Sequence, residues 1–216
     1  MIVDPRGFIL ANTRLQSPPH TPELRLHLAD EITPLWTMTE EALAAIDLPP
    51  PFWAFAWAGG QGLARYLLDH PEAVRGKTVL DFATGGGIAA IAAARCGAGP
   101  VTASDIEPLA AAAVALNAEA NGVAVVFTAE DLLADRPPRV DVLLAADISY
   151  EKPFAERART WLRRAHEQGT KVLMGDPRRT YFDTAGLVRL AEYSVPTSRE
   201  LEDFELKRTD VWTFAD

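Results

Sequence analysis

From residue 77 onward, short apolar runs alternate with longer segments in which apolar residues recur every three or four positions. The short runs predict strands in KTVLDFA, PVTASDI, VAVVFTA, VDVLLAADI and TKVLMGDP, and a last strand in KRTDVWTFA. Strands of this apolar character that alternate with helices form parallel sheets covered on both faces. The pattern therefore predicts a doubly wound α/β domain, whose ligands bind at the carboxyl ends of its strands.

The longer segments predict the helices of this domain. Four of them are GLARYLLDHP, IAAIAAARCG, EPLAAAAVALNAEANG and EKPFAERARTWLRRAHEQG. In the first helix, Leu63, Leu67 and Leu68 form an apolar stripe, and Gly122 stops the third. One more helix is predicted over residues 185–192, between the fifth strand and the last.

Residues 1–50 differ from the rest because prolines interrupt them repeatedly. The alternation of Leu24, Leu26 and Leu28 predicts a short strand, and residues 37–46 predict a helix in which Glu40 completes a capping box. We therefore expect an N-terminal extension over residues 1–50 that packs on a larger domain over residues 51–216.

Composition narrows the class of protein. The chain has 216 residues, of which 48% are hydrophobic and 24% charged, as in an ordinary soluble domain. The net charge of −9 disfavours a nucleic acid as the main partner and tolerates a cationic one. No apolar run reaches the length of a membrane span, and the N-terminus has no signal-peptide pattern, so we expect a cytoplasmic protein.

Metal and disulfide chemistry are not expected. Cys96 is the single cysteine, and the four histidines have no spacing typical of metal ligands. No sustained heptad repeat is present, which favours a monomer.

A glycine loop in VLDFATGGGIAA is the first candidate for chemistry. Gly85, Gly87 and Ala90 match the spacing of a dinucleotide fingerprint, and Asp105 follows at about the expected distance. This spacing alone leaves nicotinamide- and flavin-dependent oxidoreductases open. Glycines at a strand-to-helix turn let the backbone approach a ligand closely, whichever cofactor is bound.

Asp81 favours a different cofactor. An unpaired carboxylate inside a strand covered on both faces costs several kcal/mol. At the end of the strand it faces the cleft instead, where a cationic group can pair with it. The order Asp81-x-Ala83-x-Gly85-x-Gly87 is typical of methyltransferases that use S-adenosylmethionine. Ala83 stands where that loop usually has glycine, and alanine is tolerated there if its φ angle is negative.

Two further carboxylates follow predicted strands. Asp105 ends the second strand, where it can accept both hydroxyls of a ribose, or alternatively cap the following helix. Asp131 follows the third strand, where it either accepts the adenine amino group or lies in a surface turn.

DISY, residues 147–150, ends the fourth strand and resembles the Asp-x-x-Tyr signature of seven-β-strand protein lysine methyltransferases. A closer resemblance is to the lysine methyltransferases of the electron transfer flavoprotein β subunit and their bacterial homologues. It rests on residues 51–93, SDIEPLA, LLAADISY and VLMGDPRRTYF, with TPELRLHLADEITPLW also fitting the bacterial members.

This resemblance implies a Rossmann-like, seven-stranded methyltransferase fold, S-adenosylmethionine as cofactor and an Nε-methylated lysine as product. The acceptor would be a protein, either the flavoprotein subunit or a ribosomal protein. The implied cofactor-binding residues are Trp57, Asp81, Thr84, Gly85, Gly86, Gly87, Asp105, Ile106, Asp131, Leu132 and Ala146. Asp147 and Tyr150 would face the incoming lysine as the catalytic pair.

Methyl transfer needs an aligned, unprotonated amine. A carboxylate with an ordinary pKa is a weak base for lysine, so we expect Asp147 to orient the amine through a hydrogen bond. Tyr150 either shapes a slot for the lysine stem or packs in the core. Arg178 and Arg179 either meet an acidic stretch of the substrate or are solvated loop charges.

Three alternatives stay open at this point: a small-molecule N-methyltransferase, an NAD(P)-dependent oxidoreductase and a non-enzymatic interaction module. An open surface around Asp147 would favour a protein substrate, whereas a closed apolar pocket would favour a small-molecule substrate. Among the aromatic residues at the start of the domain, we expect Phe52 and Trp53 to pack in the core and Trp57 to reach the cofactor.

Overall fold

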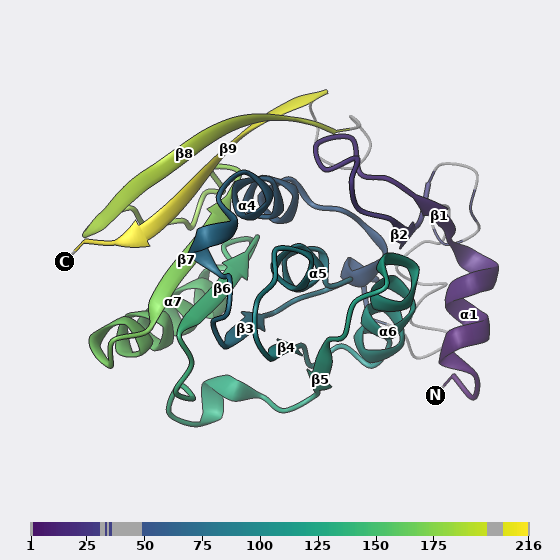
Figure 1. Ribbon diagram of the computed structural model, residues 1–216, viewed down its shortest axis with the longest axis horizontal. Helices are drawn as coiled ribbons and strands as arrows, with labels where there is room; N and C mark the ends of the chain where they lie inside the picture. Colours follow the sequence, from purple (N-terminus) through teal and green to yellow (C-terminus); the bar gives the residue numbers. More distant parts are fainter. Residues whose placement is uncertain (1, 31–32, 34, 36–48, 198–204, 216) are drawn as a thin grey trace.

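A seven-stranded sheet forms the centre of the computed structural model, which describes residues 2–30, 33, 35, 49–197 and 205–215. Its strands lie in the order β5-β4-β3-β6-β7-β9-β8 (Figure 1). The strands are β3 (Val79–Phe82), β4 (Val101–Ser104), β5 (Val126–Thr128), β6 (Val142–Ala146), β7 (Lys171–Asp176), β8 (Leu187–Pro196) and β9 (Leu206–Phe214). The first five are parallel, as predicted, while β9 runs antiparallel to both β7 and β8.

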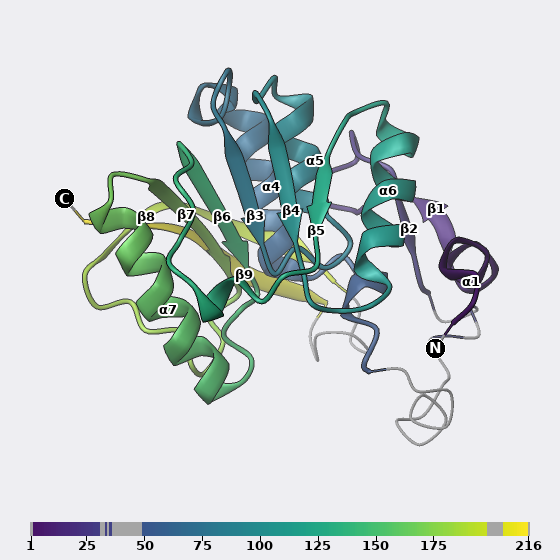
Figure 2. The same ribbon diagram turned by 90° about the horizontal axis from the view of Figure 1, so that it is seen from below.

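Helices cover both faces of the sheet (Figure 2). α4 (Ala58–Asp69), α5 (Ile88–Arg95) and α6 (Ala110–Asn121) pack on one face, and α7 (Lys152–Glu167) on the other. Successive residues of a strand point to opposite faces of the sheet. In β6, Val142 and Leu144 pack with α4 and α5, whereas Leu143 and Ala145 pack with α7. Within the described ranges, no helix is long and apolar enough to cross a membrane.

The helix predicted over residues 185–192 is wrong, because residues 187–192 belong to β8 and the two residues before them lie in a turn. β8 pairs with β9 from Leu187 opposite Phe214 to Pro196 opposite Leu206, with a register shift between Arg189 and Ala191. Leu, Arg, Ala and Glu are good helix formers, which explains the error. Pairing along a neighbouring strand overrides that local preference.

The N-terminal segment is attached to α6. It contains α1 (Pro5–Asn12) and a two-stranded sheet of β1 (Arg14–Gln16) and β2 (Leu26–Leu28), so the predicted short strand is confirmed. The backbone amide of His27 donates to Oδ1 of Asn117 at 2.7 Å. Asn117 in turn donates through Nδ2 to the Gly86 carbonyl in the glycine loop, at 2.8 Å. The helix predicted over residues 37–46 lies outside the described residues.

The order of the strands reverses next to β3. The chain proceeds from β3 to β4 and β5 on one side, then returns to place β6 and β7 on the other. Loops that leave the carboxyl ends of β3 and β6 therefore diverge and leave a crevice between them.

Candidate active site

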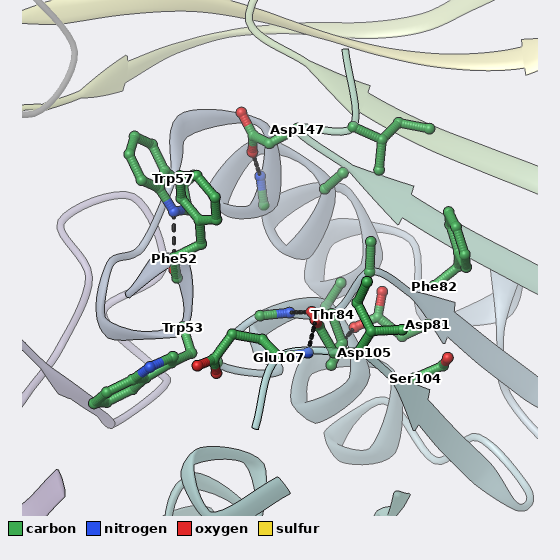
Figure 3. A pocket seen from close by; sticks show the side chains of 18 of the residues that line it. Phe52, Trp53, Trp57, Asp81, Phe82, Thr84, Ser104, Asp105, Glu107 and Asp147 are labelled. Carbon is green, nitrogen blue, oxygen red and sulfur yellow. Dashed lines mark hydrogen bonds between the residues drawn. The ribbon is translucent and has the colours of Figure 1, made fainter. Parts of the chain in front are cut away.

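A cavity of about 460 Å³ lies at these carboxyl ends. Figure 3 shows Asp147 and Trp57 toward one end, and Asp81, Thr84, Asp105 and Glu107 toward the other. Twelve of the thirteen site residues predicted from the sequence line it: Trp57, Asp81, Thr84, Gly85, Gly86, Asp105, Ile106, Asp131, Leu132, Ala146, Asp147 and Tyr150. The fold thus brings residues from five loops to one place.

The glycine loop joins β3 to α5 and is anchored by Asp81. The Asp81 side chain is 2% exposed, and its Oδ2 accepts hydrogen bonds from the Thr84 hydroxyl and from the Ala90 amide at 3.0 Å. Burial raises the pKa of this carboxyl to about 7, although the two hydrogen bonds lower it. Asp81 lies at the end of β3 and lines the cavity, as its position in the sequence indicates.

The backbone conformation of Ala83 differs from the expectation. Its φ angle is 53°, in the left-handed region, so the expectation of a negative φ is wrong. A β-carbon in this conformation costs about 1–2 kcal/mol, and glycine avoids this strain. The loop therefore keeps the backbone path of a glycine at this position despite the alanine.

Gly85 and Gly86 line the cavity, and Gly87 does not. A β-carbon on Gly86 would lie 2.6 Å from the Trp53 carbonyl oxygen, so only glycine fits. Gly87 precedes α5 with a φ of 85°, and a β-carbon there would meet Val114 Cγ2 at 3.0 Å. Gly87 thus shapes the turn between loop and helix.

Asp105 connects β4 to the glycine loop. Its Oδ2 accepts from the Gly85 amide at 2.8 Å, and its Oδ1 accepts from the Glu107 amide at 3.0 Å. Burial raises the pKa of this carboxyl, against the hydrogen bonds that it accepts. The alternative role as a helix cap is wrong, because α6 begins at Ala110 with Leu109 in the capping position.

Glu107 is a cavity residue that sequence reasoning missed. Its Oε2 accepts from the Leu109 amide at 3.0 Å, while its Oε1 is a buried acceptor without a hydrogen-bond partner in the described structure. Burial raises the pKa of Glu107 to about 7. The SDIEP stretch places an acidic residue two positions after Asp105, which was the available signal.

Asp131 lies in an exposed turn at the cavity, and its contact with adenine stays a prediction. It lines the cavity, yet its side chain is exposed and Oδ1 caps the short helix η3 (Leu132–Ala134) by accepting from the Leu133 amide at 3.1 Å. Leu132 and Ala146 add apolar surface beside it.

Asp147 follows β6 and is held on two sides. Gly60, in the first turn of α4, donates its amide to Oδ2 at 2.8 Å, and Arg179 NH2 donates to Oδ1 at 2.7 Å. Tyr150 lies three residues on, 48% exposed, with its ring 5.3 Å from that of Phe52. Tyr150 is therefore not a core residue. Burial raises the pKa of its hydroxyl, and the charge of Glu151 adds to this.

The two candidate arginines differ. Arg178 pairs with Asp210 and Glu192, at 2.8 and 2.6 Å. Arg179 lines the cavity, pairs with Asp147 and lies over the Trp57 ring, with 5.6 Å between Cζ and the ring centroid. Both arginines thus bind carboxylates of their own chain, and only Arg179 reaches the cavity.

The aromatic residues at the start of the domain differ from the prediction in which of them pack in the core and which reach the cavity. Trp53 is fully buried, as expected, although it also borders the cavity, whereas Phe52 is 42% exposed and lines the cavity. Trp57 also lines it, and its indole N–H donates to the Phe52 carbonyl at 3.0 Å. Phe52 lies in a single turn of helix, η1 (Phe52–Ala54), whose other residues are buried.

The charge of the lining suits a cationic ligand. Seven acidic side chains line the cavity: Asp81, Asp105, Glu107, Glu130, Asp131, Asp147 and Glu151. Because burial raises the pKa of Asp81 and of Glu107 to about 7, these two are only partly ionised at neutral pH. Among the described lining residues, Arg179 is the only arginine or lysine. A pyrophosphate group would meet repulsion here, whereas a sulfonium with an ammonium group would be attracted. The unpartnered Oε1 of Glu107 can accept a hydrogen bond from a hydroxyl or amino group. The residues present therefore fit S-adenosylmethionine.

Comparison with known proteins agrees with this geometry. The family described as "Ribosomal protein L11 methyltransferase (PrmA)" matches residues 62–172. An electron transfer flavoprotein beta subunit lysine methyltransferase of Xenopus laevis is 41% identical over 97% of this chain and 87% of its own length. This chain belongs to that lysine methyltransferase family.

Two further similarities are more limited. A ribosomal protein L11 methyltransferase of Dechloromonas aromatica is 42% identical, over 44% of this chain and 33% of its own length. The magnesium protoporphyrin IX methyltransferase of Synechocystis PCC 6803, solved with bound S-adenosylmethionine, is 20% identical with a TM-score of 0.53, over 73% of this chain and 80% of its own. This last likeness shows the shared methyltransferase fold. The protein is a methyltransferase, and the oxidoreductase alternative is set aside.

Proposed function

We propose that this protein transfers a methyl group from S-adenosylmethionine to a lysine side chain of the electron transfer flavoprotein β subunit. The observation that carries the proposal is the Asp147 carboxylate, held beside Trp57 and Tyr150 in a cavity that also contains the glycine loop. The relatives named for this activity match nearly the whole chain, including its N-terminal segment. The ribosomal methyltransferase relative matches less than half of it, which makes a ribosomal protein the second candidate.

The cofactor would bind at the end of the cavity where Asp81 and Asp105 lie. We infer that Asp105 accepts the ribose hydroxyls and that Glu107 offers its unpartnered oxygen nearby. The adenine ring would lie between Ile106 and Leu132, with Asp131 at its edge. The Gly85 and Gly86 backbone leaves room for close approach. When bound, the cofactor supplies a methyl group on a sulfonium, which is already an activated electrophile.

The protein must then present a neutral amine in line with that methyl. A free lysine has a pKa of about 10.4, so losing its proton at pH 7 costs about 4–5 kcal/mol. Positioning accounts for a large part of the acceleration in such displacements. We assign Asp147 to orientation, because it is fixed by Gly60 and can accept a hydrogen bond from the amine.

Aromatic side chains at the opening would hold the aliphatic stem of the lysine. The ring of Tyr150 lies 5.3 Å from Phe52 and 5.8 Å from Phe154. Phe52 and Tyr150 are each roughly half exposed, so an extended segment of a protein can reach them. This exposure favours a protein over a small enclosed substrate.

The test is transfer of labelled methyl from S-adenosylmethionine to purified electron transfer flavoprotein β subunit and, separately, to ribosomal protein L11. Mass spectrometry of the labelled protein identifies the lysine. We expect label on the flavoprotein subunit, absent when its modified lysine is replaced by arginine. Label on L11 alone would replace the proposed substrate with the second candidate.

A cytoplasmic location and a monomeric state remain predictions. Cell fractionation tests the first, and light scattering of the purified protein tests the second.

A further inference from the structure

We propose that Arg179 is a positioning residue for methyl transfer, which holds the Asp147 carboxylate in place and, through its fixed positive charge, favours the neutral form of the substrate amine. This inference rests on the proposed function and assigns a role to a residue that sequence reasoning left open.

Asp147, Trp57 and Asp176, all in the part of the chain that the structure describes, contact Arg179. Its guanidinium contacts Asp147 Oδ1 through both Nε, at 3.2 Å, and NH2, at 2.7 Å. Its Cζ lies 5.6 Å from the centroid of the Trp57 ring. Its backbone amide donates to Asp176 Oδ1 at 2.8 Å. The Arg179 side chain is 19% exposed and that of Asp147 11%, so the ion pair is largely shielded from solvent.

Asp147 is constrained from the opposite side as well. Its Oδ2 accepts from the Gly60 amide, and a β-carbon on Gly59 would lie 2.5 Å from the same oxygen. The backbone amide of Asp147 donates to the Gly175 carbonyl at 3.0 Å, and its φ angle is 55°. With α4 on one side and Arg179 on the other, the carboxylate has a fixed orientation.

The charge of Arg179 matters because Asp147 alone would raise the pKa of the substrate amine and so disfavour its neutral form. A carboxylate beside an amine stabilises the ammonium form and raises the pKa of the amine. A guanidinium at the same place opposes this, because it keeps its charge at every physiological pH. The pair therefore offers a hydrogen-bond acceptor with little net negative charge.

Other charged groups surround this pair. Burial raises the pKa of Asp176 to about 7, and the charge of Asp147 adds to this shift. Arg178 is neutralised by Asp210 and Glu192, while Tyr150 and Glu151 lie on the cavity side. Among the described cavity-lining residues, Arg179 is the only arginine or lysine that opposes this negative surrounding.

The test compares the pH dependence of kcat at saturating substrate for Arg179→Gln, Arg179→Lys and the wild type. Below the pKa of the bound amine, kcat falls tenfold per pH unit, so the acidic limb reports that pKa. Arg178→Gln is the matched control, because it removes the same charge one residue away, outside the cavity. Binding of S-adenosylhomocysteine checks that each variant is folded.

For Arg179→Gln we expect the acidic limb to move up by about one pH unit, with turnover at least about tenfold lower at pH 7 and only partly restored at high pH, because the Asp147 carboxylate also loses a contact that holds it. Arg179→Lys, which keeps the charge, should leave the limb near its wild-type position, as should Arg178→Gln. If Arg179→Gln lowers kcat equally at every pH, or raises it, the role of Arg179 is wrong. If the wild type does not methylate the flavoprotein subunit, the proposed substrate fails instead, and the profiles are recorded on the protein that it does label in cell extract.

Discussion

The Asp105 carboxylate accepts a hydrogen bond from the backbone amide of Gly85, with 2.8 Å between Oδ2 and the nitrogen. These residues follow adjacent parallel strands, β4 and β3, so their juxtaposition comes from the sheet. The residue proposed to hold the ribose therefore also fixes the loop proposed to approach the cofactor. Replacing Asp105 should therefore weaken cofactor binding in two ways, through the lost ribose contact and through the loss of the hydrogen bond that fixes the loop.

We expect Asp105→Ala to weaken S-adenosylhomocysteine binding by about 10–100-fold, because a hydrogen bond to a charged group contributes about 1.5–3 kcal/mol. Titration calorimetry measures the effect. Asp135→Ala is a suitable control, since Asp135 is an exposed acidic residue just after η3 and does not line the cavity. Equal affinity for the Asp105 variant and the wild type would remove Asp105 from the cofactor site.

Asp147→Asn should abolish most methyl transfer without disturbing the cofactor. Asparagine tolerates the φ of 55° at this position better than alanine does, so it separates the loss of charge from backbone strain. We expect kcat to fall by at least about 100-fold, while the affinity for S-adenosylhomocysteine changes by less than about threefold. Near-normal turnover in a variant that binds the cofactor would contradict the role given to Asp147.

The two tryptophans allow a comparison of binding with folding. Trp53 is fully buried and packs with Ile9 and Leu109, so Trp53→Ala should lower the free energy of unfolding by about 3–5 kcal/mol. Both tryptophans border the cavity, but only Trp57 is partly exposed, so Trp57→Ala should cost little stability and weaken S-adenosylhomocysteine binding by about tenfold. Urea unfolding and calorimetry on both variants test this. Comparable affinity losses in the two, after correction for the unfolded fraction, would count against a cofactor contact by Trp57.

The sequence predicts the parallel part of the sheet because each strand is an apolar run and each helix has an apolar face. It does not predict β8, since pairing of Leu187–Pro196 with the next strand, Leu206–Phe214, overrides the helix-forming residues of the segment. Periodicity within the segment is also weak, because most residues of this edge strand are at least partly exposed.

The candidate site could also be predicted only in part from the sequence. Residues at the ends of strands, such as Asp81, Asp105 and Asp147, could be placed at one edge of the sheet from topology alone. The pairing of Asp147 with Arg179 could not, because Asp147 follows β6 and Arg179 follows β7 and the geometry of both loops decides it. The positive φ of Ala83 was missed for a related reason: neighbouring strands, not the alanine itself, impose the backbone path.

We expect Asp81 to make cofactor binding sensitive to pH. Burial raises the pKa of its carboxyl to about 7, so at pH 6.5 the free protein holds it mostly protonated. A cationic ligand bound beside Asp81 favours the ionised form and lowers that pKa, so binding releases a proton. Below pH 7 the ligand must drive this ionisation, and by about pH 8 it is nearly complete in the free protein. The affinity for S-adenosylhomocysteine, whose amino group is cationic, should therefore rise from about pH 5.5 to about pH 8 and level off above.

Calorimetry at pH 6.5 in buffers with different ionisation enthalpies measures the protons released. Asp81→Asn should remove most of this release, because asparagine does not ionise while its side-chain oxygen still accepts hydrogen bonds from Thr84 and Ala90. Glu107→Gln is the matched control: its carboxyl also has a pKa raised to about 7 and lines the same cavity, but it lies beside the proposed ribose position. If proton release persists in Asp81→Asn and disappears in Glu107→Gln, the cationic part of the ligand lies beside Glu107 instead.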